Sequence, residues 1–172
     1  TNLGSVLNEL EKIDEGERYL RKALNINPAS HMALNNLGNI LSKKKNNSEA
    51  EFCYRKAIEI KSDFSLAYNN LASLLSRQGK LSEAEALTEK AIFYNPKFEL
   101  AYVNLGTIKI DLDKSSEAEE LFLNAIEINK NYSYAYRNLF RLYEKTNNIN
   151  KLKTKIESLR EDKNIINEIL MF

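Results

Sequence analysis

Apolar residues recur every three or four positions along most of the chain, a pattern that predicts amphipathic helices. The stretches ALNNLGNILSK at 33–43 and EAEFCYRKAIEI at 49–60 are typical, and a short polar stretch separates them. Tight turns favour Gly and Pro, yet the 172 residues include only 5 Gly and 2 Pro. We therefore expect a mostly helical protein and not many short strands joined by hairpins.

The helical segments repeat with a period of 34 residues, and like residues fall into columns. One column is leucine and the next is small in four of five rows, while two further small columns lie seven residues apart. Small residues at this spacing share one stripe of a helix and let a second helix pack closely, so each row predicts a pair of helices. The four columns are Leu3, Leu37, Leu71, Leu105 and Leu139; Gly4, Gly38, Ala72, Gly106 and Phe140; Gly16, Ala50, Ala84, Ala118 and Leu152; and Ala23, Ala57, Ala91, Ala125 and Leu159.

Local signals indicate where the second helix of each row begins and ends. An acceptor followed three residues later by Glu is a capping box, which favours a helix start. Pro28 and Pro96 follow the second helices of their rows, where a residue that cannot continue a helix ends it. The predicted capping boxes are Asp14 with Glu17, Ser48 with Glu51, Ser82 with Glu85, and Ser116 with Glu119.

This pattern resembles the tetratricopeptide repeat, whose rows carry Leu-Gly in the first helix, two Ala in the second and often Pro at the end. The resemblance implies an all-α fold, a right-handed α-solenoid of stacked antiparallel helix pairs that forms a single domain over residues 1–172. The rows cover 1–30, which lacks the first four positions of a repeat, then 31–64, 65–98, 99–132 and a divergent 133–161. Residues 162–172 are expected to form a C-terminal capping helix, because their apolar residues have helical spacing.

Charge and composition narrow the function. The 25 Lys+Arg and 24 Asp+Glu residues give a net charge of +1, which argues against generic nucleic-acid binding. No stretch approaches the roughly 18 to 20 consecutive apolar residues that cross a bilayer, so we expect no membrane partner. One cysteine, Cys53, and one histidine, His31, allow neither an internal disulfide nor a Cys/His metal site, which fits a cytoplasmic location.

No nucleophile, base and orienting group recur as a motif, and the chain has no Gly-rich phosphate loop. We therefore expect a protein that is not an enzyme and needs no cofactor or metal. Cys53 and the tyrosine column of Tyr68, Tyr102 and Tyr136 are expected to pack in the core, as are Tyr54 and Phe122.

Asparagine occupies the sixth position of every row. In the resembling family, ligands lie on the concave face, which the first helices line, and this position points there. An Asn side chain offers one acceptor and two donors, so a ladder of them can bond to the backbone of an extended peptide. A similar asparagine ladder lines the repeats of O-linked N-acetylglucosamine transferases. The predicted peptide-binding residues are Asn2, Asn36, Asn70, Asn104 and Asn138 in the ladder, Asn35, Asn39 and Asn69 beside it, and the basic Lys43, Arg77, Arg137 and Arg141.

These features predict a non-catalytic protein-interaction scaffold that binds an extended peptide segment of a partner in its groove. Three alternatives stay open at this point. The rows can be the substrate-recognition arm of a longer enzyme such as a glycosyltransferase. They can self-associate into a homo-oligomer through exposed terminal helices, including the apolar C-terminal segment. Repeats copied by duplication can also inherit an asparagine column that no ligand uses.

Overall fold

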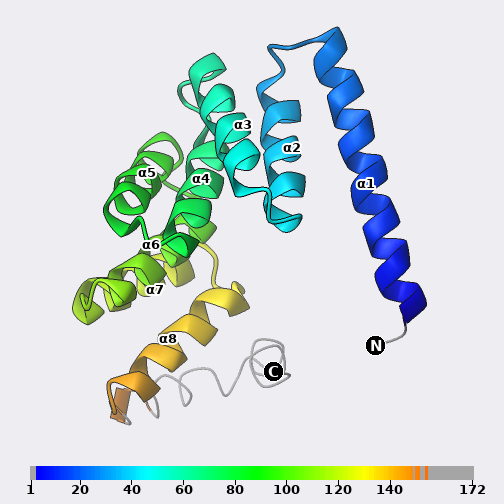
Figure 1. Cartoon of the computed structure of the whole chain (residues 1–172). Helices are drawn as coiled ribbons and strands as arrows, with labels where there is room; N and C mark the ends of the chain where they lie inside the picture. Colours follow the sequence, from blue (N-terminus) through cyan, green and yellow to red (C-terminus); the bar gives the residue numbers. More distant parts are fainter. Residues whose placement is uncertain (1–2, 149, 152–153, 155–172) are drawn as a thin grey trace. The chain divides into compact units, whose positions relative to one another are not determined.

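The computed structural model describes residues 3–148, 150, 151 and 154, and every regular element in this part of the chain is an α-helix (Figure 1). The all-α helical-repeat fold expected from the sequence is therefore confirmed. The predicted capping helix at 162–172 lies outside the described residues, as does most of the second helix of the last row. The helices are α1 (Leu3–Ile26), α2 (His31–Lys43), α3 (Asn47–Ile60), α4 (Ser65–Arg77), α5 (Leu81–Tyr94), α6 (Glu99–Asp111), α7 (Ser115–Ile128) and α8 (Ser133–Lys145).

The chain forms two compact units, residues 1–80 and 81–172. In the first unit α1 packs against α2, α2 against α3, and α3 against α4. The second unit follows the same order, with α5 against α6, α6 against α7, and α7 against α8. The first helices of successive rows also touch within each unit, α2 with α4 and α6 with α8.

In two rows, close packing of the two helices depends on glycine. A Cβ atom on Gly38 would lie 2.6 Å from the Tyr54 ring, and one on Gly106 would lie 2.5 Å from the Phe122 ring. Both rings are buried, with 2% and 0% of their surface exposed. The rings fill the space that the missing side chains leave, so the two helices of the row approach closely. The sequence correctly placed both aromatic residues in the core.

The first helix of each of four rows ends in the same backbone turn. Lys45, Gly79, Asp113 and Asn147 occupy equivalent positions and have φ angles of 61, 77, 59 and 52°. The residue that follows donates its N–H to a carbonyl five residues earlier, as in Asn46 to Leu41 at 2.9 Å. This is the Schellman arrangement, which satisfies carbonyl groups at a helix end.

The predicted capping boxes do not form. Ser48, Ser82 and Ser116 are the second residues of α3, α5 and α7, and the N-caps of α3 and α7 are Asn46 and Lys114, with no side-chain cap bond. The physical reason is the Schellman turn, whose last residue leads straight into the next helix and leaves no room for a separate cap. Pro28 and Pro96 do follow the ends of α1 and α5, as expected.

The first row also differs from the prediction, because residues 3–26 form one unbroken helix instead of two. Asp14 therefore lies inside α1 and caps no helix. Glu11 stands where Lys45, Gly79 and Asp113 adopt positive φ in later rows. Glutamate is a good helix former, but lysine is one as well and Lys45 still adopts positive φ, so the residue type at this position does not by itself explain the unbroken helix. In Figure 1 the N-terminal end of α1 extends beyond α2.

A column of glutamates joins each row to the next. Glu17 accepts a hydrogen bond from Lys44 at 2.7 Å, and Glu51 lies 3.7 Å from Lys80. In the second unit, Glu85 pairs with Lys109 at 2.6 Å. Glu119 pairs with Lys151 at 2.7 Å and accepts the Tyr143 hydroxyl at 3.0 Å. These glutamates are the residues that the sequence assigned to capping boxes, and they link neighbouring rows instead.

We predict that Gly106→Ala lowers stability, although alanine favours a helix over glycine by about 1 kcal/mol. The new methyl group would clash with the buried Phe122 ring, and overpacking of a core costs about 1–3 kcal/mol. Urea unfolding measures the change. Gly16→Ala is the matched control, because its methyl would meet only the terminal Cδ1 of Ile40, at 3.0 Å. This control should keep or raise stability, and equal losses in both variants would contradict the role of close packing.

We also predict that Glu85 contributes to stability only above its unfolded pKa. The hydrogen bond from Lys109 lowers the pKa of Glu85 below the ordinary value of 4.5. A carboxyl group with a lower pKa in the folded state stabilises the protein above the unfolded pKa, and this contribution is lost as pH falls. Glu85→Gln should therefore lose stability at neutral pH and show a weaker decline below pH 4.5 in urea unfolding. Glu127→Gln, an exposed position on α7, should keep the original pH dependence.

Candidate functional site

Three asparagine side chains connect α2 with α4 in the first unit. Asn70 on α4 donates a hydrogen bond from Nδ2 to Oδ1 of Asn35 on α2, at 3.0 Å. Asn35 in turn donates weakly to Oδ1 of Asn36, at 3.5 Å. Asn36 is exposed and Asn70 is half-buried. The ladder position is thus presented at the surface in two adjacent rows, and a buried amide orients one of the two side chains.

The residues beside the ladder lie deeper than the sequence predicted. Asn35 and Asn69 are each only 1% exposed, so their expected place on an open surface is corrected by the structure. Successive helix residues turn by about 100°, which carries the position before the ladder into the helix interface. Asn39 is half-buried and accepts a hydrogen bond from the Tyr54 hydroxyl at 2.8 Å, so it supports the row interior.

The basic residues at the C-terminal ends of α2 and α4 are exposed. Arg77 donates from Nη2 to Oγ of Ser42 at 2.7 Å and from Nη1 to Oγ of Ser73 at 3.1 Å. These two bonds tie α4 to α2 and hold the guanidinium in a fixed place at the surface. Lys43, which follows Ser42 in the sequence, is the last residue of α2 and is also exposed.

The second unit carries the remaining predicted residues on α6 and α8. Asn104 and Asn138 are half-buried. Asn138 donates to the carbonyl of Tyr134 one turn earlier on its own helix, at 2.8 Å, which turns its amide towards α8 itself. The Arg137 guanidinium lies 5.7 Å from the Tyr134 ring centroid. Arg141 is exposed, and Asn2 lies outside the described residues.

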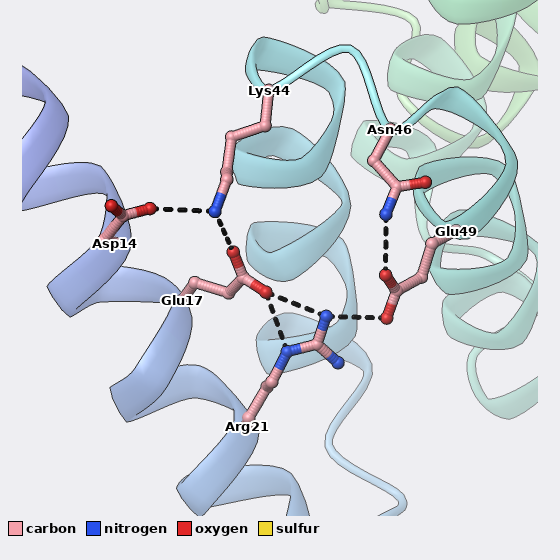
Figure 2. Close-up of polar contacts among 6 residues, drawn as sticks. All are labelled: Asp14, Glu17, Arg21, Lys44, Asn46 and Glu49. Atoms are coloured by element: carbon pink, nitrogen blue, oxygen red, sulfur yellow. Dashed lines mark hydrogen bonds and ion pairs between the residues drawn. The ribbon is translucent and has the colours of Figure 1, made fainter.

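A second polar cluster joins α1 to α2 and α3 (Figure 2). Lys44 donates to Asp14 at 2.8 Å and to Glu17 at 2.7 Å. Arg21 lies 2.8 Å from Glu17 and 2.7 Å from Glu49, which lies in the first turn of α3. Figure 2 shows the side chains of Glu17 and Arg21 reaching from α1 towards the helices of the second row.

The charges of this cluster are matched within the protein. Hydrogen bonds from Lys44 and then Arg21 lower the pKa of Glu17, and those to Asp14 and then Glu17 raise the pKa of Lys44. An open depression of about 380 Å³ lies beside them, and Arg18, Lys22 and Asn25 complete its lining. Because its central charges already pair with each other, we assign the cluster to holding α1 on the second row.

Only an indirect signal in the sequence points to these contacts. The period-34 column of Glu17, Glu51, Glu85 and Glu119 was visible, but its partners Lys44, Lys80, Lys109 and Lys151 stand at different places in their rows. A repeat-column search therefore finds the acceptors but only one donor column, that of Lys80 and Lys114, which lie 3.7 Å from Glu51 and Glu85. Arg77 and Ser42 also stand at different positions of their rows, so the repeat columns do not predict their hydrogen bond.

The described residues offer no clear reactive group. Burial, and then the charge of Glu49, raise the pKa of the Cys53 thiol to about 11, so it is not a ready thiolate. No cluster of His, Cys, Asp or Glu in the described part of the chain could hold a metal ion. Among the described helices, none has the length and apolar character needed to cross a membrane.

Comparison with known proteins agrees with this architecture. Models of the tetratricopeptide repeat match residues 31–64, 53–86, and both 1–30 and 100–132. No curated protein sequence matches the chain.

Solved structures share the fold. The crystal structure of MamA has a TM-score of 0.70 at 20% identity, and the match covers 98% of this chain and 95% of MamA. YrrB, described as a TPR protein with an unusual peptide-binding site, gives 0.69 at 22% identity over 84% of this chain and 74% of YrrB. The first TPR of Spaghetti (RPAP3), bound to the HSP90 peptide SRMEEVD, gives 0.64 at 25% identity over 67% of this chain and 92% of that domain. With repeat models matching most of its length and these helices in place, the chain belongs to the tetratricopeptide repeat family.

Proposed function

We propose that this chain is a non-catalytic scaffold that binds an extended peptide segment of a partner protein along the first helices of its repeats. The observation that carries the proposal is the amide chain on α2 and α4. The buried Asn35 accepts a hydrogen bond from the Asn70 amide and so orients it. Asn36, which occupies the same column as Asn70 one row earlier, is exposed. An amide that is oriented before a ligand arrives loses less entropy on binding.

The spacing of this face suits an extended backbone. Neighbouring helices pack about 8–10 Å apart, and an extended chain advances about 3.3 Å per residue. Ladder residues of adjacent rows thus match a peptide about every third residue. The bond to Asn35 uses one N–H of Asn70, so its second N–H and its carbonyl oxygen can pair with peptide groups. Recognition of this kind reads the backbone more than the side chains.

The end of the face favours an acidic ligand group. Ser42 and Ser73 hold the Arg77 guanidinium in place, and Lys43 is exposed on the neighbouring helix. A guanidinium has five N–H donors, so two bonds to hydroxyl groups leave others for a carboxylate. We therefore expect peptides with an acidic residue near one end to bind best.

Two relatives support a peptide as the ligand class. YrrB is described by its peptide-binding site, and the Spaghetti domain was solved with the HSP90 peptide SRMEEVD. This chain shares its repeated helix pairs with both proteins. Because the fold is shared, we propose the same class of ligand, a peptide, for this chain. Its sequence is a matter for experiment.

Selection from a random-sequence peptide library, followed by titration of the best binder, tests the proposal. The double variant Asn36→Ala/Asn70→Ala should weaken binding about 3- to 10-fold for each lost hydrogen bond, with unchanged helicity. Asn124→Ala is the matched control. Asn124 is exposed on α7, the second helix of its row, so this variant should keep full affinity. Equal affinity of the double variant and the control would contradict peptide recognition by the ladder.

The two kinds of asparagine should also differ in stability. Asn35→Ala removes the buried acceptor of the Asn70 amide, so we expect a loss of about 1–2 kcal/mol in urea unfolding. Asn36→Ala alters an exposed side chain and should change stability by less than about 0.5 kcal/mol. Similar losses for both variants would mean that Asn36 is also structural and would weaken its assignment to a ligand.

A further inference from the structure

The exposed stripe on α2 and α4 changes from apolar to basic along each helix. Each helix has an exposed apolar residue in its first turn, a ladder asparagine four positions later, and an exposed basic residue at its last position. The two apolar residues are 62% and 38% exposed. Because successive helix residues turn by about 100°, the three positions fall within about 40° of one another and share one stripe. The two triplets are Met32, Asn36 and Lys43 on α2, and Leu66, Asn70 and Arg77 on α4.

The two stripes lie side by side and run in the same direction. Asn70 donates to Asn35 near the middle of the helices, and Arg77 donates to Ser42 near their C-terminal ends. Both bonds join residues that are 35 apart in the sequence, so the helices are parallel and in register. The face made by the two triplets, the α2–α4 face, therefore has an apolar edge, a row of asparagines and a basic edge.

The dimensions of the α2–α4 face suit a peptide that lies across both helices. Four helix positions rise by about 6 Å and seven by about 10 Å, so the asparagines lie nearer to the apolar edge. Successive side chains of an extended peptide point to opposite sides. With its backbone on the asparagines, one set would meet Met32 and Leu66, and the other would meet Lys43 and Arg77. Lysine and arginine are long enough to span the greater distance.

The basic edge carries charge that the described part of the protein does not neutralise. Among the described residues, neither Lys43 nor Arg77 forms an ion pair with a carboxylate, and Arg77 bonds to two serine hydroxyls. The next residue along the chain, Lys44, does pair with Asp14 and Glu17. The positive charge at this edge therefore favours acidic side chains in a ligand.

The second unit keeps the apolar edge but mixes the charges. Leu100 is half-buried on α6, and Tyr134 is 37% exposed on α8. The last positions of these helices are Asp111 and Lys145, which are both exposed and have opposite charge. Such a pair selects no single sign of ligand charge, so the argument for an acidic ligand applies to α2 and α4.

We propose that the α2–α4 face selects an extended peptide in which apolar and acidic residues alternate. This selection rests on peptide binding by the ladder asparagines and specifies which peptide side chains are recognised. Alternate apolar side chains pack on Met32 and Leu66 and remove exposed apolar surface from water. The acidic side chains between them pair with Lys43 and Arg77. A peptide of the same composition in another order cannot place all its side chains on the matching edge.

Two labelled peptides of equal composition test the selection on the full chain. One has the alternating sequence ELELELE, and the other has the same residues in blocks, EEEELLL. We expect fluorescence anisotropy to show that the alternating peptide binds about 3- to 10-fold more tightly, because only this order meets both edges. Equal affinities would overturn the selection, as would a failure of the alternating peptide to bind where library-selected peptides do.

Variants at the two edges assign the contacts. Met32→Ser/Leu66→Ser should weaken binding of the alternating peptide about 10-fold, since the apolar contact is lost. Phe52→Ser is the matched control, because Phe52 is 57% exposed on α3, a second helix, and should not contact the peptide. Lys43→Gln/Arg77→Gln should weaken binding about 2- to 5-fold and reduce its salt dependence. Circular dichroism should show unchanged helicity, and full affinity in both edge variants would overturn the assignment.

The double variant Asn36→Ala/Asn70→Ala separates this selection from peptide binding itself. Weaker binding in this variant, with full affinity in both edge variants, would overturn selection by side chains and leave peptide binding by the ladder standing. Weaker binding in the edge variants alone would support the two edges and contradict the role of the asparagines. Losses in all three variants are the result that we expect.

Discussion

The close approach of the two helices in a row is the constraint on which the other contacts depend. In two rows a ring from the second helix packs where the first helix has no side chain, Tyr54 on Gly38 and Phe122 on Gly106. A methyl group at either glycine would meet a buried ring well inside normal contact distance. This contact fixes the distance between the helices, and the positions of the polar side chains on their surfaces follow from it.

Contacts between rows are polar at the helix ends. Glutamates of one row reach lysines of the next, which lie near the end of its first helix, in the turn or just after it, as Glu17 does to Lys44 and Glu119 does to Lys151. Partly exposed ion pairs are individually weak. Their value here is geometric: Lys44 and Lys80 stand in turns whose backbone the Schellman bonds already fix, and Lys109 is part of α6. The hydrogen bond from Asn70 to Asn35 makes a similar polar link between α4 and α2.

Periodicity predicted the features that most rows repeat, including the helix pairs and the small-residue columns, and it placed Tyr54 and Phe122 in the core. It was less successful where one residue can serve two purposes. Ser48 followed by Glu51 fits a helix cap, yet the backbone turn takes the capping role and frees Glu51 for a lysine. Asn35 and Asn36 are adjacent and chemically identical, and only the helix phase, which follows from packing, decides which one is buried. The first row kept its columns but not its turn, since residues 3–26 form one helix.

The glutamate contacts also bear on how such a protein can grow. The acceptor keeps one position in each row, but the lysine that reaches it comes from different positions, such as Lys44, Lys80 and Lys151. A lysine side chain is long and flexible enough to reach the same carboxylate from several starting points. A row duplicated or exchanged by recombination would therefore bring its own acceptor and find a cation in almost any successor. Such tolerance would let the number and order of rows change without redesign of each junction.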